Sequence, residues 1–261
     1  MAATIVVSSG GGEATAGSDY TSVNQTLTFA AGQTQQTVQV AIGQDSALES
    51  NETFSLTLSS PSAGNIETAS ASLTINDDDQ STWSIAANAS APIDEGAGSS
   101  SFTVTRSGAT NNSATVVVNA GGGSATGGMA NDYDNTQRTL TFAAGETAKV
   151  ISVSINNDLL LESVETFNAS LTSVSTGVVD SAAASATVTL MDNDNVIWAV
   201  VADAQSINEA GGQAGFTVSR TGNVQQTDTI VFSTGAGTAV AGSDFTATTQ
   251  TLTFAAGETS K

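Results

Sequence analysis

The chain repeats itself, and this repetition limits the folds open to it more than any other feature. The string Thr-Leu-Thr-Phe-Ala-Ala-Gly begins at Thr26, returns 113 residues later at Thr139, and returns again 112 residues later at Thr251. Self-similarity at a fixed period indicates an array in which one structural unit recurs. We therefore predict a tandem array of similar domains.

Acidic triplets mark the ends of the repeating units. Asp77–Asp79 is followed closely by Trp83, and the segment Asp192–Asp194 is followed at the same spacing by Trp198. We predict one complete unit and two partial ones, and both chain ends are interpreted as cuts through a unit. The predicted units are residues 1–79, which lack the N-terminal strands, residues 80–194, which are complete, and residues 195–261, which are truncated after their N-terminal part.

Short runs of alternating polarity, separated by clusters of Gly, Asn and Ser, predict β-strands in the complete unit. Phe102–Arg106 and Ala186–Leu190, for example, alternate apolar side chains with hydroxyl or charged ones, which gives one face for a core and one for water. No stretch has a helical period. We expect an all-β fold, a seven-stranded antiparallel sandwich of two sheets, with strands at 83–88, 100–106, 114–120, 137–142, 148–155, 165–172 and 183–191.

The composition excludes several classes of function. Asp and Glu number 25 against 5 Lys and Arg, a net charge of -20, which argues against nucleic acid or anionic lipid as a partner and favours cations. Cysteine and histidine are both absent, so there are no disulfides, no thiolate sites and no activated nucleophile, and we predict that the chain is not an enzyme. No apolar run is long enough to span a membrane, and the N-terminus has no signal core.

The direction of the strands predicts where the acids gather. Successive strands of a sandwich run between its two ends, so the loops alternate between the ends. The segments that carry Asp94–Glu95, Asp132, Asp158–Glu165 and Asp192–Asp194 all fall at one end. The same alternation places the acidic end of each unit against the base of the next, so the units join head to tail.

An uncompensated group of carboxylates is unfavourable, because like charges close together oppose ionisation. A bound cation removes this conflict. Ligands that are oxygens only, with no His or Cys, select a hard ion, and several carboxylates on flexible loops suit calcium better than magnesium. We expect calcium to stiffen the junctions between units.

These motifs together resemble the Calx-beta motif, over essentially the whole chain. The resemblance rests on an early Glu, on Gly17-Ser18-Asp19-Tyr20, on the Asp-x-x-x-Glu-x-x-Glu-x-Phe pattern at Asp45–Phe54 and Asp158–Phe167, and on the terminal acidic triplet. Members of this family include the calcium-binding regulatory domains of sodium/calcium exchangers and long bacterial surface or secreted proteins. The resemblance implies immunoglobulin-like sandwiches that bind calcium in their distal loops, within a structural or adhesive segment of a larger extracellular or cell-surface protein.

The resemblance also implies a set of calcium ligands. Two positions depart from the best calcium binders of the family: amides stand at Asn157 and Gln44, and Asn193 replaces the middle acid of the second triplet. Lower ligand charge predicts fewer or weaker ions. The implied ligands are Glu95, Asp132, Asp158, Glu162, Glu165, Asp192 and Asp194 in the complete unit, Asp19, Asp45, Glu49, Glu52, Asp77, Asp78 and Asp79 in the first, and Glu209 and Asp244 in the third.

Simpler interpretations stand beside these. Asp19, Asp132 and Asp244 also suit ordinary turns, and Glu52 and Glu165 are the weakest ligand candidates because each lies beside a strand start. For the whole chain, the alternative is a calcium-independent adhesin or spacer in which the acids confer solubility. The expected partners are calcium ions and neighbouring repeats, and the sequence points to no particular protein or glycan as an adhesion partner. Structural roles are predicted for Arg106, Arg220, Trp83 and Trp198.

Overall fold

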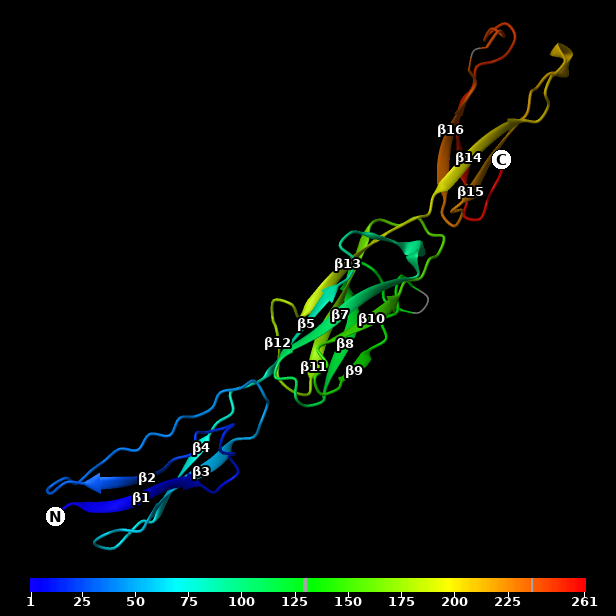
Figure 1. Ribbon diagram of the computed structural model, residues 1–261. Helices are drawn as coiled ribbons and strands as arrows, with labels where there is room; N and C mark the ends of the chain where they lie inside the picture. The colour runs from blue at the N-terminus through cyan, green and yellow to red at the C-terminus, as the bar shows by residue number, and fades with distance from the viewer. Residues whose placement is uncertain (129–130, 236) are drawn as a thin grey trace.

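A computed structural model describes residues 1–128, 131–235 and 237–261, and it shows three β-rich bodies in a row (Figure 1). The N-terminus lies in the first body of this row and the C-terminus in the last (Figure 1). Within the described ranges the only helical segments are two short 3-10 turns, η1 (Glu95–Ala97) and η2 (Glu209–Gly211). None of the described helices is long and apolar enough to cross a membrane.

The central body is a sandwich of two sheets, as the alternation of polarity predicted. All seven predicted strands are present, with ends shifted by a few residues. The first sheet has the order β10-β7-β5-β12 and the second the order β6-β13-β11-β8-β9. The strands are β5 (Ser81–Ala87), β6 (Ile93–Asp94), β7 (Ser99–Gly108), β8 (Ala114–Gly123), β9 (Arg138–Phe142), β10 (Ala148–Ser154), β11 (Glu165–Val174), β12 (Val178–Val179) and β13 (Ser185–Met191).

Two short strands were not predicted, and both pair in parallel. β6 runs beside β13, with Ile93 opposite Leu190, and β12 runs beside β5. Each is two residues long, which is too short for alternation of polarity to reveal. β6 matters for the acidic end of the sandwich, because it carries the chain directly into η1 beside the last residues of β13.

The main core lies in the central body, between its two sheets. Alternate residues of β7 and β8 point into it, and Phe102, Val104, Val116 and Val118 are all essentially buried. The indole of Trp83 meets another buried ring edge-on, with the ring centroids 4.9 Å apart. Burying each large apolar side chain contributes roughly 1.5–3 kcal/mol, so this body has the strongest scaffold for a site.

The first body holds a single sheet of order β2-β1-β3-β4, the counterpart of β9-β8-β11-β13, and the third body holds two hairpins. Buried apolar side chains are few in both: Val7, Tyr20 and Phe54 in the first, and Val218 and Phe254 in the third. The strands are β1 (Ala3–Gly10), β2 (Asn24–Phe29), β3 (Glu52–Ser59), β4 (Ser70–Ile75), β14 (Val196–Ala202), β15 (Phe216–Gly222), β16 (Asp228–Ser233) and β17 (Thr249–Phe254).

Candidate metal centre

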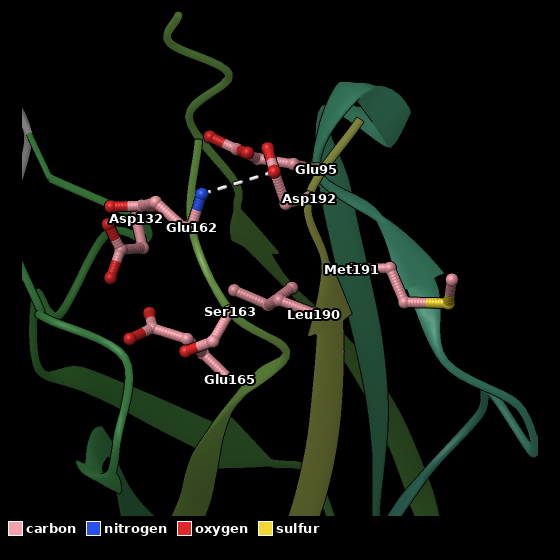
Figure 2. A pocket seen from close by; sticks show the side chains of 8 residues that line it. All are labelled: Glu95, Asp132, Glu162, Ser163, Glu165, Leu190, Met191 and Asp192. Atoms are coloured by element: carbon pink, nitrogen blue, oxygen red, sulfur yellow. Dashed lines mark hydrogen bonds between the residues drawn. The ribbon is translucent and has the colours of Figure 1, made fainter. Parts of the chain in front are cut away.

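Four separate segments bring acidic side chains to one end of the central sandwich, as the strand directions predicted. Figure 2 shows side chains from η1, from the loop before β9, from the loop before β11 and from the end of β13 around one hollow. These segments are distant in sequence, and they meet because β6, β13, β11, β8 and β9 are neighbours in the second sheet and bring them to the same end of it. The hollow is lined by Glu95, Asp132, Glu162, Ser163, Glu165, Leu190, Met191 and Asp192.

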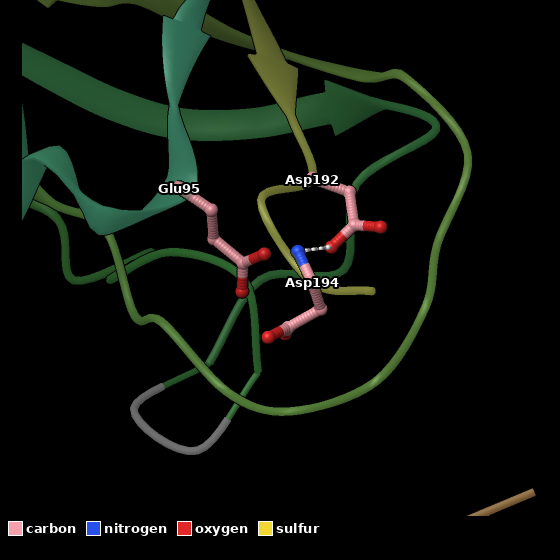
Figure 3. Close-up of side chains that lie close together, drawn as sticks. All are labelled: Glu95, Asp192 and Asp194. Atoms are coloured by element: carbon pink, nitrogen blue, oxygen red, sulfur yellow. Dashed lines mark hydrogen bonds between the residues drawn. The ribbon is translucent and has the colours of Figure 1, made fainter. Parts of the chain in front are cut away.

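One group of carboxylates joins η1 to the segment after β13. Glu95, Asp192 and Asp194 each offer an oxygen, and these oxygens lie within 4.8 Å of one another (Figure 3). The backbone N–H of Asp194 donates to Asp192 Oδ1 at 3.0 Å, which folds this segment into a tight turn. Glu95 is only 5% exposed. Oδ2 of Asp194 is buried, and no described residue donates a hydrogen bond to it.

A second group lies alongside the first. Asp132, Glu162 and Glu165 also place one oxygen each within 4.8 Å of the others. The backbone N–H of Glu162 donates to Asp192 Oδ2 at 3.1 Å, so a residue of the second group is tied directly to a residue of the first (Figure 2). The two groups therefore form one continuous acidic tip.

The electrostatics of the tip are unfavourable to full ionisation. Burial, and then repulsion from Asp132 and other neighbouring carboxylates, raises the pKa of Glu162 from its usual 4.5 to about 7. Burial is also the main cause that raises the pKa of Glu95, Glu165 and Asp194, with nearby carboxylates adding to it. Ionisation of all these carboxylates at once is therefore unfavourable when no counter-ion is near them.

The protein supplies no such counter-ion from its own basic residues. Four of the five pair with acids elsewhere, in the contacts Arg138–Asp134, Lys149–Glu146, Arg220–Asp228 and Lys261–Glu258. The fifth, Arg106, is buried and donates to Ser81 and to backbone carbonyls. No salt bridge of the described residues involves either carboxylate group, so no basic side chain offsets the charge of the tip.

The comparison with known protein families identifies the repeat. The family model of the Calx-beta domain matches residues 2–79, 77–194 and 192–261. The chain belongs to the Calx-beta family.

Solved structures of Calx domains resemble parts of the chain. The apo form of the Calx CBD1 domain is 21% identical, with a TM-score of 0.40, over 44% of this chain and 100% of that one. CBD12 from CALX1.2 is 20% identical, with a TM-score of 0.38, over 72% of this chain and 87% of that one. The calcium binding domain CBD12 of CALX1.1 is 23% identical, with a TM-score of 0.32, over 66% and 68% of the two chains.

Two stacked aromatic rings lie close in sequence to acids of the second group in the central Calx-beta repeat. Tyr133 follows Asp132 directly, Phe167 lies two residues after Glu165, and the two rings stack with centroids 4.4 Å apart. Gly123 lets the loop after β8 approach, since a Cβ there would lie 2.1 Å from the carbonyl oxygen of Thr166. The stack and the glycine together hold the two acidic segments side by side.

Asp158 lies beside the two groups but belongs to neither. Its backbone N–H donates to Glu95 Oε1 at 3.1 Å, and its own Oδ1 accepts from the backbone N–H of Leu160 at 2.6 Å. Its carboxylate contributes to the raised pKa values of Glu95, Glu162 and Asp194. Asp158 therefore adds charge to the tip and shapes the loop before β11.

An amide network at the tip was only partly foreseen. The Asn193 side chain donates to Asp94 Oδ1 at 2.9 Å and to Asn157 Oδ1 at 2.8 Å. From the sequence, Asn157 and Asn193 were expected to be weaker substitutes for acids, and Asp94 was not among the predicted ligands. The one signal for their contact was that both amides occupy positions where the family favours aspartate.

The first Calx-beta repeat builds its tip in the same way. Asp45 Oδ1 accepts from Ala47 N–H at 2.7 Å, and Asp77 Oδ2 accepts from Glu49 N–H at 3.2 Å, as their counterparts do in the central repeat. Among the residues described, the two compact groups of three occur in the central repeat alone. The predicted ligands of the first repeat line one hollow, namely Asp19, Asp45, Glu49, Glu52, Asp77, Asp78 and Asp79.

The third Calx-beta repeat has two predicted ligands, which join no carboxylate group among the described residues. Glu209 is exposed in η2, and Asp244 accepts from the backbone N–H of Val240 at 2.7 Å. Asp19 and Asp132 accept backbone N–H groups in the same manner, at 2.5 and 2.6 Å. The turn role considered for these three aspartates is therefore present, and a carboxylate has further lone pairs left for an ion.

The donor set of the central tip fits a hard divalent cation. All the available donors are oxygens, the two carboxylate groups are adjacent, and one buried oxygen of Asp194 has no partner among the described residues. Hard cations such as calcium take six to eight oxygen ligands from carboxylates and carbonyls on adaptable loops. The arrangement offers the type of ligand that such an ion takes.

Proposed function

We propose that the chain is a calcium-binding tandem-repeat segment, in which calcium at the acidic tips stiffens the junctions between repeats. The observation that carries the proposal is the pair of adjacent carboxylate groups at the central tip, which no basic side chain of the described protein neutralises. Glu95, Asp158, Asp192 and Asp194 hold one ion, and Asp132, Glu162 and Glu165 hold another.

The other repeats take part according to the acids they carry. In the first repeat we assign the ligands to the seven acids that line its hollow. In the third, Glu209 and Asp244 contribute to a site that needs further ligands. Calcium is favoured over magnesium because several carboxylates on loops suit its larger and less regular coordination shell.

The junctions support a mechanical role for the ion. A single residue, Gln80, separates Asp79 from β5, and a single residue, Asn195, separates Asp194 from β14. An ion bound by Asp79 or Asp194 therefore restrains the linker itself. This suits a structural or adhesive segment of a larger extracellular or cell-surface protein, a setting in which other members of the family occur.

Calorimetry of the whole chain tests calcium binding. The thermal midpoint should rise with millimolar calcium and change much less with magnesium. The double variant Asp158→Asn, Glu162→Gln should lose the rise of the central repeat, whereas Glu146→Gln, Asp180→Asn, which removes the same charge at the base, should keep it. Equal midpoints in calcium and chelator would make the chain a calcium-independent spacer.

Scattering tests the junctions separately. We expect a longer and stiffer particle in calcium than in chelator, because carboxylates that repel one another leave the linkers mobile. Equal particle lengths under the two conditions, in a chain that does bind calcium, would remove the junctions from the proposal and leave the ion sites intact.

A further inference from the structure

A side chain of the central repeat forms hydrogen bonds with the backbone of the first repeat. The Asn111 side-chain amide receives the Leu48 N–H at its Oδ1 (2.9 Å), and its Nδ2 donates to the Leu48 carbonyl oxygen (3.1 Å). Asn112 Nδ2 donates to the same carbonyl oxygen at 3.2 Å. Both polar groups of one backbone residue are thus satisfied by a repeat that lies more than 60 residues further along the chain.

Leu48 lies inside the acidic loop of the first repeat. The N–H groups of the residues on either side of it, Ala47 and Glu49, donate to carboxylates of their own tip, Asp45 and Asp77. The N–H of Leu48, between them, points instead to the next repeat. The loop that carries the proposed ligands therefore has its conformation set partly by its own acids and partly by its neighbour.

The turn that presents Asn111 is held from within the central repeat. Arg106, which is 1% exposed, donates to the carbonyl oxygens of Asn112 at 2.7 Å and Ala109 at 3.1 Å. Its guanidinium also lies over the Trp83 ring, 5.4 Å from the centroid. The turn that carries Asn111 is therefore held in place by the buried Arg106. Because the turn is already ordered, forming the contact with Leu48 costs little conformational entropy in this turn.

The second junction has the same turn but lacks the corresponding hydrogen bonds to the preceding repeat in the described part of the chain. Arg220 holds the corresponding turn through the carbonyl oxygen of Gln226, at 3.0 Å. Gln225 stands where Asn111 stands in the central repeat, and it is exposed. In the described part of the chain, neither Gln225 nor any other residue forms a hydrogen bond to the backbone of Leu161, the counterpart of Leu48.

We propose that the turn between β7 and β8 is a docking surface for the acidic loop of the preceding repeat, and that Asn111 is the residue that recognises it. Asn111 is a positioning residue: it orders the loop that carries Asp45 and Glu49 without contacting an ion. We call this contact between Asn111 and Leu48 the latch. The first junction has the latch, and the second, with Gln225, does not. The calcium part of this inference rests on the proposed function, whereas the latch itself does not.

Spin-label distances in the whole chain test the latch, and the absence of native cysteine makes labelling specific. Ser72→Cys with Thr141→Cys spans the first junction, and Thr187→Cys with Thr253→Cys spans the second. In calcium and in chelator, we expect a narrower distance distribution across the first junction. Asn111→Ala should broaden it to the width of the second, and the matched control Gln225→Ala should change neither. An unchanged width in Asn111→Ala, or equal widths in the parent chain, would overturn the latch.

Calcium titration tests the positioning role. The titration uses the background Asp158→Asn, Glu162→Gln, in which the central site is disabled. There, Asn111→Ala should weaken calcium binding by the first repeat about fivefold, a typical coupling between adjacent sites, and Gln225→Ala should leave it unchanged. Equal affinity with and without Asn111 would refute the positioning role. If the parent chain binds no calcium, the proposed function fails. The widths of the distance distributions measured in chelator still show whether the contact between Asn111 and Leu48 restrains the first junction.

Discussion

The carboxylate of Glu95 accepts a hydrogen bond from the backbone N–H of Asp158 at 3.1 Å, across 63 residues of chain. This bond joins η1 to the loop before β11. It is one of the contacts within the protein that hold the acidic segments of the tip together. Contacts that fix carboxylates close to one another lower the ordering cost of the ion binding that we propose, and a bound ion would relieve the repulsion among them.

The first prediction concerns the charge of Glu95. Glu95→Gln keeps an acceptor for the Asp158 N–H and removes one negative charge. We expect the thermal midpoint in chelator to rise by a few degrees, because repulsion at the tip falls, and calcium affinity to drop roughly tenfold. Calorimetry in chelator and a calcium titration measure the two effects. A fall in both quantities would mean that Glu95 acts mainly through packing.

The second prediction concerns pH. The pKa of Glu162 is raised to about 7, so between its unfolded value of 4.5 and pH 7 the folded chain binds more protons than the unfolded chain. The stability contributed by the protonated carboxyl is therefore lost as pH rises through this window. In chelator, the thermal midpoint should rise by a few degrees from pH 8 to pH 5.5.

Two comparisons sharpen the pH test. Glu162→Gln should make the profile measured in chelator less steep, because the carboxyl whose pKa is raised to about 7 is gone while Glu95, Glu165 and Asp194 remain. With calcium present, acidification should instead shrink the calcium-induced rise, since a protonated carboxyl is a poor ligand. A parent chain whose midpoint in chelator is the same at pH 8 and pH 5.5 would contradict the assignment.

The third prediction concerns the amide network. Asn193→Asp removes the donor that serves Asp94 and Asn157 and adds a carboxylate to the tip. We expect a loss of about 1–2 kcal/mol of stability in chelator, because hydrogen bonds to acceptors are lost beside new repulsion, together with tighter calcium binding. The reverse change in the first repeat, Asp78→Asn, should weaken its calcium binding. Isothermal titration of both variants checks the opposite signs.

The fourth prediction concerns the base of the central repeat. Arg106 donates to Ser81 Oγ and to two carbonyl oxygens while lying over Trp83. Lysine has no planar fork of donors, so Arg106→Lys should cost about 2–3 kcal/mol of stability by leaving buried acceptors unpaired. Arg138→Lys, at a half-buried ion pair on the side of β9, keeps the cation and should cost less than about 1 kcal/mol. Equal losses in urea unfolding would show that the buried fork is unimportant.

Much of this fold was predictable because its signals are periodic or repeated. Alternating polarity located the strands, and counting strand directions brought Glu95, Asp132 and Asp192 to one end without any coordinates. The structural roles predicted for Arg106 and Trp83 are also confirmed, since both are buried and the Arg106 guanidinium lies over the Trp83 ring. Such features follow from the direction of each strand and from the burial of particular side chains, and both can be inferred from the pattern of polar and apolar residues in the sequence.

The features that escaped prediction depend on single contacts between distant residues. β6 is two residues long and leaves no periodic trace, although it sets Glu95 beside Asp192. The contact between Asn157 and Asn193 and the contact of Asn111 with Leu48 are each made by one amide side chain, a residue type common in any loop. Nothing in the sequence distinguishes these asparagines from others until the strands are placed in space.

The parallel pairing of β6 with β13 bears on how the molecule would carry a tensile load. A pulling force along the chain enters the central repeat at β5 and leaves it at β13. Because β6 pairs with β13 in parallel, this force loads the pair in shear, and the backbone hydrogen bonds between the two strands must break together. Glu95 follows β6 directly and Asp192 follows β13. An ion shared by these two side chains would bridge the sheared joint, and calcium would then set the force at which the repeat opens.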